Sequence, residues 1–163
     1  MRLSSSRNPA ARAKGARGLT LLELVVATTI LLVLSTLALP LAQMRVKRER
    51  ETELRQALRE MRTAIDRYKD ATDRNLIAVE LGTEGYPPDL ETLVEAVPLA
   101  GAPDRRVRFL RKIPQDPMTK SADWGRRCVQ DDPDSNSWCG KNVFDVYTRS
   151  TGTALDGTRY SDW

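Results

Sequence analysis

The chain has 163 residues, with 26 Lys and Arg against 22 Asp and Glu, two cysteines and no histidine. The lack of histidine excludes Ser-His-Asp and Cys-His catalysis and histidine-ligated zinc sites. Residues 1–18 hold five of the basic residues and no acid, so residues 19–163 carry 21 basic against 22 acidic residues. This balance gives no support to nucleic-acid binding.

Residues 19–41 form an apolar run in which Glu23 is the only charge. A helix of ~22 residues measures ~33 Å at 1.5 Å per residue, which matches the hydrocarbon core of a bilayer. The sequence therefore predicts a membrane-spanning helix over residues 19–41. By the positive-inside rule, the basic segment 1–18 stays in the cytoplasm and the rest of the chain crosses.

A plain membrane anchor would have the same length, but the carboxylate of Glu23 is costly inside an apolar run and indicates a function. Residues 18–24, Gly-Leu-Thr-Leu-Leu-Glu-Leu, follow a basic leader, and Pro40 lies further along the run. This pattern resembles the type IV prepilin family. The resemblance implies cleavage between Gly18 and Leu19 by a prepilin peptidase, and N-methylation of Leu19. It also implies assembly roles for Glu23, which would neutralise the Leu19 amine of a neighbouring subunit, and for Pro40, which would kink the helix.

Residues 42–75 are expected to continue the helix as an amphipathic half. Apolar side chains recur there at steps of four and three, which is typical of a helix with one buried stripe. The members of the stripe are Leu54, Leu58, Met61, Ile65 and Tyr68.

Residues 76–163 are expected to form a globular region with a short helix capped by Asp89, a strand over 143–148 and a C-terminal loop. The segments 85–93, Gly-Tyr-Pro-Pro-Asp-Leu-Glu-Thr-Leu, and 113–117, Ile-Pro-Gln-Asp-Pro, resemble the major pseudopilins of type II secretion systems, as does the terminal Asp-Trp. The expected fold is therefore the α+β type IV pilin fold. In that fold a long N-terminal helix, with a membrane-spanning half and an amphipathic half, packs on a small antiparallel sheet.

Cys128 and Cys139 lie in the part of the chain expected outside the cytoplasm, and they predict a disulfide. The segment 131–136 between them, Asp-Asp-Pro-Asp-Ser-Asn, suggests either a calcium loop or a solvated turn. The turn is the preferred interpretation, because the spacing does not match an EF-hand. In the major pseudopilins the C-terminal loop commonly binds calcium, and the resemblance offers Ser150, Asp156 and Asp162 as candidate ligands, although the loop is shorter here. No other cofactor is expected.

The resemblance implies a structural subunit of a type II secretion pseudopilus, without enzymatic activity, that polymerises through its N-terminal helix to drive protein export across the outer membrane. The implied location is the inner membrane, as a single-pass protein with a cytoplasmic leader and a periplasmic domain, and then a periplasmic filament. The implied partners are other copies of the chain, minor pseudopilins, the prepilin peptidase and the inner-membrane assembly platform. The alternatives are a type IV pilin of a surface fibre, a non-polymerising membrane-anchored periplasmic binding protein, and an anchored enzyme that uses a free, activated cysteine.

Overall fold

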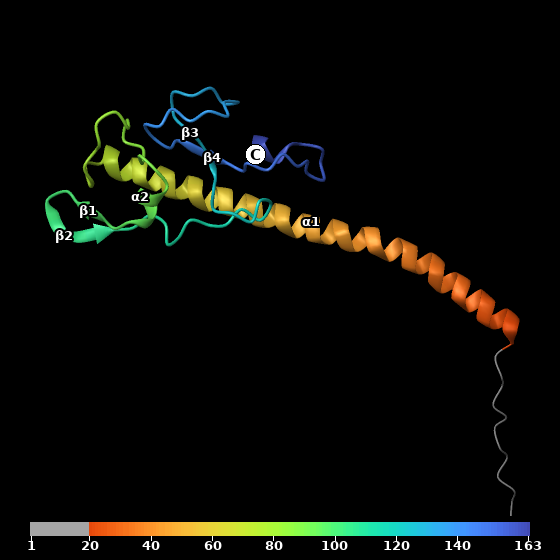
Figure 1. Ribbon diagram of the computed structural model, residues 1–163. Helices are drawn as coiled ribbons and strands as arrows, with labels where there is room; N and C mark the ends of the chain where they lie inside the picture. Colours follow the sequence, from red (N-terminus) through yellow and green to blue (C-terminus); the bar gives the residue numbers. More distant parts are fainter. Residues whose placement is uncertain (1–19) are drawn as a thin grey trace, which may run out of the picture. The chain divides into compact units, whose positions relative to one another are not determined.

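The computed structural model describes residues 20–163, apart from the side chains of residues 37–42. The leader 1–18, the cleavage site between Gly18 and Leu19, and the methylation site at Leu19 lie outside the described residues. The elements are α1 (Leu21–Asp73), α2 (Glu91–Val94), β1 (Val97–Leu99), β2 (Ala102–Val107), β3 (Gly125–Arg127), β4 (Asp145–Tyr147) and the 3-10 helix η1 (Tyr160–Asp162) (Figure 1). The chain separates into two compact units, Met1–Ala42 and Gln43–Trp163.

Helix α1 is 53 residues long and begins directly after Thr20. The Thr20 hydroxyl accepts a hydrogen bond from the backbone N–H of Glu23 at 3.2 Å, which satisfies one of the unpaired donors of the first turn. Glu23 also lies in this first turn, where a negative charge complements the helix dipole. Pro40 lies within α1, and its side chain is outside the described residues.

Within residues 20–163, no helix combines the length and the apolar character needed to cross a bilayer. This finding contradicts the predicted transmembrane helix and the predicted single-pass inner-membrane localisation, so both predictions are wrong. In the described part of this helix, the side chains from Thr20 to Thr36 include one charge, that of Glu23. Charged residues follow from Arg45 onward.

The fold prediction is also wrong in its sheet. In place of one small antiparallel sheet, the described residues form two separate two-stranded antiparallel sheets, β1 with β2 and β3 with β4. The register between β1 and β2 shifts between Pro98 and Leu99. Because β1, β3 and β4 have three residues each and a strand-free stretch separates β2 from β3, no continuous ladder forms. The expected type IV pilin fold is thus not observed.

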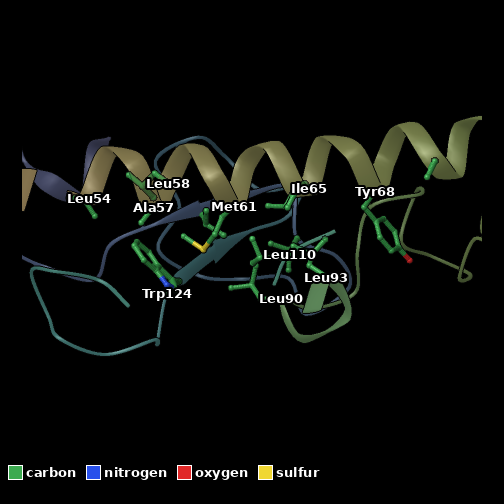
Figure 2. Close-up of a cluster of buried hydrophobic side chains, with 14 of the residues drawn as sticks. Leu54, Ala57, Leu58, Met61, Ile65, Tyr68, Leu90, Leu93, Leu110 and Trp124 are labelled. Carbon is green, nitrogen blue, oxygen red and sulfur yellow. The ribbon is translucent and has the colours of Figure 1, made fainter. Parts of the chain in front are cut away.

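The core of residues 43–163 lies along one face of α1. The predicted stripe is buried, and side chains from α2 and the loops pack against it (Figure 2). Leu90, Leu93 and Leu110 lie opposite the middle of the stripe, and Trp124 lies near its start (Figure 2). The indole of Trp124 donates a hydrogen bond to the carbonyl of Pro114 at 2.9 Å, so its polar group is satisfied in the core.

Asp116 of the Ile-Pro-Gln-Asp-Pro segment is fully buried, and its carboxylate has a structural role as a hydrogen-bond acceptor. Its carboxylate accepts hydrogen bonds from the Met118 N–H, at 2.7 Å, and from the Thr148 hydroxyl. The carboxylate therefore fastens this segment to the chain that follows β4. The expected cap at Asp89 is present as a hydrogen bond from the Thr92 N–H at 2.8 Å, although Leu90 directly precedes α2.

The close approach of β3 and β4 depends on Gly125. A Cβ at this position would lie 2.3 Å from the Tyr147 ring, whereas a Cβ at Gly152 would lie 3.1 Å from the Tyr160 ring. We expect Gly125→Ala to lower the free energy of unfolding by about 1–3 kcal/mol, because the ring and the strand must move apart. Urea denaturation of the full chain measures this loss. Gly152→Ala is the matched control and should lose less; equal losses in the two variants would contradict the steric account.

Candidate functional site

The N-terminal unit presents an exposed, mostly apolar helix surface. In this unit ten large apolar side chains of α1 are 50–84% exposed, and they lie in two groups, within residues 21–26 and 30–34, that together reach every face of the helix. A helix that is apolar all round is normally found buried. These side chains are Leu21, Leu22, Leu24, Val25, Val26, Ile30, Leu31, Leu32, Val33 and Leu34.

The hydroxyl groups in this segment make their hydrogen bonds inside the helix. Thr28 donates to the Leu24 carbonyl at 2.9 Å, Thr29 to the Val25 carbonyl at 2.7 Å, and Ser35 to the Leu31 carbonyl at 2.7 Å. Donors that bond back to the preceding turn are not available to water or to a polar partner. The surface is therefore suited to apolar neighbours.

Glu23 is the single charged residue between Thr20 and Met44. In the part of the chain that the structure describes, no hydrogen bond or ion pair holds its carboxylate. A carboxylate enclosed by apolar side chains would cost several kcal/mol without a partner. Its predicted partner, the amine of Leu19, lies outside the described residues, so this pairing stays a prediction.

A second cluster, in the unit Gln43–Trp163, joins α1 to the C-terminal segment. Glu51 is buried, and its carboxylate accepts hydrogen bonds from the Leu155 N–H at 2.8 Å and the Tyr160 hydroxyl at 3.0 Å. Burial and the hydrogen bond to Glu51 raise the pKa of Tyr160 to about 12. The phenol is therefore neutral and acts as a donor at physiological pH.

Two arginines of α1 complete this cluster. The guanidinium of Arg62 pairs with Asp145 at 2.6 Å and donates to the backbone oxygens of Val146, at 3.2 Å, and Trp163, at 2.8 Å. Arg55 lies over the Trp163 ring, 4.0 Å from its centroid. We call Glu51, Arg55 and Arg62 the C-terminal clamp. The clamp was not predicted from the sequence. The one sequence signal for it is the presence of charged residues directly beside the apolar stripe.

The three calcium candidates have separate partners. Hydrogen bonds from the Thr158 hydroxyl and N–H lower the pKa of Asp156, which also lies 3.8 Å from Arg55. Ser150 accepts a hydrogen bond from the Gly152 N–H at 3.3 Å, and Asp162 accepts one from Ser161 at 3.0 Å.

Ser150 and Asp162 also line different hollows, of about 580 and 390 Å³. Arg127 and Arg159 line the same hollow as Asp134 and Asp162, so two guanidinium groups compete with a cation for the two carboxylates there. Calcium binding by this loop stays a prediction.

The predicted disulfide between Cys128 and Cys139 is present. Asp131 lies inside the loop, and its Oδ2 accepts hydrogen bonds from the N–H groups of Cys128, at 2.7 Å, and Cys139, at 3.3 Å. These three residues have the spacing of a metal site, but the two sulfurs are bonded to each other and offer no thiolate. The group closes the loop, as expected of a stapled turn.

Comparisons of the chain with protein-family models, with curated proteins and with solved structures give no match.

The raised pKa of Tyr160 predicts a pH dependence of stability. Between the ordinary value of 10.0 and about 12, the folded protein keeps a phenol proton that the unfolded chain has released. Stability from this proton is present below pH 10 and is lost as the pH rises toward 12. Urea denaturation across this range should show that wild type loses more stability than Tyr160→Phe. A parallel decline in both proteins would contradict the role of the buried phenol.

The disulfide is expected to make a measurable contribution to the free energy of unfolding. Replacing both cysteines, Cys128→Ser with Cys139→Ser, should lower the free energy of unfolding by about 3 kcal/mol, because the loop of 11 positions is free to open in the unfolded chain. Urea denaturation measures this loss. A reductant should reproduce it in wild type and leave the double variant unchanged; equal stability of all samples would contradict it.

Proposed function

We propose that this protein is a structural subunit of a helical filament, and that copies assemble through the N-terminal part of α1. The observation that carries the proposal is the exposed surface of α1 over residues 21–34, which is apolar apart from Glu23 and two threonines. Contiguous exposed apolar surfaces of this kind mark sites of interaction. The same helix from neighbouring copies, packed side by side, would cover this surface with side chains of matching length and chemistry.

The hydrophobic effect would drive this assembly. Full burial of one Leu, Ile or Val side chain is worth about 1.5–3 kcal/mol, and ten such side chains are exposed here. Association of several copies would remove much of this surface from water. This attraction has no direction, because the helix is apolar on every face, so it fixes no axial position between neighbouring helices.

Glu23 supplies the missing register. As the single charge in the apolar part of the helix, it requires a cationic partner once neighbours exclude water. The resemblance to prepilins provides that partner as the amine of Leu19 on an adjacent copy, exposed when a prepilin peptidase removes residues 1–18. On the same resemblance, the filament is the pseudopilus of a type II secretion system. Its further partners are minor pseudopilins and an assembly platform.

If Glu23 fixes the axial position between neighbouring helices, Glu23→Ala should assemble poorly. In cells that also make a prepilin peptidase, the variant should be processed like wild type, while its yield of sedimentable filament falls about tenfold or more, because the amine is left unpaired. Glu53→Ala, which removes an exposed carboxylate from the polar part of the same helix, is the matched control and should assemble normally. A normal yield from Glu23→Ala would remove the register argument.

The intact mass of the purified wild-type protein separates processing from assembly. A mass equal to residues 19–163 plus one methyl group and minus two hydrogens supports cleavage, methylation and the disulfide together. An uncut chain, or one cut at another position, would contradict the prepilin interpretation before any filament is sought.

A further inference from the structure

A groove with a positive rim runs along α1 in the unit Gln43–Trp163. It has a volume of about 590 Å³ and lies between the helix and the segment that follows β2. Arg59 and Arg67 line its helix side, and Arg111 lines the other side. The buried side chains of Ala64 and Leu110 also line it. The groove therefore combines an apolar base with three guanidinium groups.

The charge of this groove is not neutralised within one copy. Arg59, Arg67 and Arg111 are exposed, and none of them forms an ion pair with any residue in the range 20–163. Glu60 is the one acidic residue among those that line the groove. The neighbouring stretch 105–112 adds further positive charge, since it contains five basic residues and no acid. Guanidinium groups in such a setting favour a carboxylate-bearing segment.

The same chain carries an acidic loop of suitable character. The loop 128–139, which the disulfide closes, contains three aspartates and no Lys or Arg. Asp131 is used inside the loop, whereas Asp132 and Asp134 are exposed and form no ion pair within the described chain. A hydrogen bond from Arg127 to the Ser135 carbonyl, at 3.0 Å, further fixes the loop. A loop fixed in this way loses little conformational entropy on binding.

The loop and the groove lie on different sides of α1. In Figure 1 the loop, drawn in light blue, lies above the helix, and the segment that follows β2, drawn in teal, runs below it. The helix therefore separates the two surfaces within one copy. Two complementary surfaces at different places on one subunit make a head-to-tail contact, which produces an open helical filament when the rotation does not close.

We propose that the acidic loop 128–139 of one copy binds the arginine groove of the next copy, with Asp132 and Asp134 facing Arg59, Arg67 and Arg111. The inference rests on the proposed function, since it requires neighbouring copies in a filament. It adds a second, polar contact between subunits, in the unit Gln43–Trp163, to the apolar contact of the N-terminal helix. Because the pairs are charged and near the surface, salt should weaken this contact.

Charge reversal tests the proposal. Reversing the groove with Arg67→Glu and Arg111→Glu, or the loop with Asp132→Lys and Asp134→Lys, should each lower the filament yield about tenfold, because like charges then face each other. The four substitutions combined in one chain should restore most of the yield. Lys120→Glu with Lys141→Glu makes the same change in net charge as the groove reversal, at exposed positions outside the groove, and should leave the yield unchanged.

The outcomes separate this inference from the proposed function. If wild type forms no filament, both fail. If wild type assembles and neither reversal lowers the yield, the groove contact alone is wrong. If reversal of the groove lowers the yield but reversal of the loop does not, the groove holds a different acidic segment and the proposal is overturned. Urea denaturation of each variant must show wild-type stability, so that a loss of yield reports on the contact between copies.

Discussion

Burial of the apolar stripe on α1 is the interaction on which the structure of residues 43–163 depends. The two sheets have two strands each, and sheets of this size are not stable alone in water. Their residues, together with α2 and the long connecting segments, are held because Leu58, Met61 and Ile65 offer them one continuous apolar surface. The helix thus replaces the larger sheet that a small α+β domain would otherwise use to build its core.

Polar contacts then determine where each segment lies on that surface. Apolar contacts tolerate many arrangements, whereas a buried carboxylate or guanidinium requires particular partners. Glu51 selects Tyr160 and the Leu155 N–H, and Arg62 selects Asp145 together with two backbone oxygens. Among the described residues, no buried side-chain polar atom lacks a hydrogen-bond partner. The C-terminal segment therefore has one position against the helix in which these buried polar groups all have hydrogen-bond partners.

Local sequence patterns predicted part of this structure. They did not predict which distant segments pair with each other. The stripe on α1 and the disulfide could be predicted, because periodic spacing and cysteine count are visible over a few turns of sequence. The alternation at 143–148 indicated a strand but not its partner, so one sheet was expected where two are found. The clamp joins residues 83 to 109 positions apart, and nothing near Glu51 or Arg62 in the sequence indicates those partners. The membrane span was predicted from the length and apolar content of residues 19–41, and the described part of the chain contradicts it.

The distance along the chain between Glu51 and Tyr160 has a consequence for folding during synthesis. The ribosome releases the helix face that forms one wall of the core long before it releases Ala154 and Tyr160, which complete the same core. Contacts between such distant residues form slowly, because a long loop must close first. The nascent chain therefore exposes an apolar helix stripe until residues 154–160 are free to pack against it. During that interval the chain is most prone to aggregate and has most need of a chaperone.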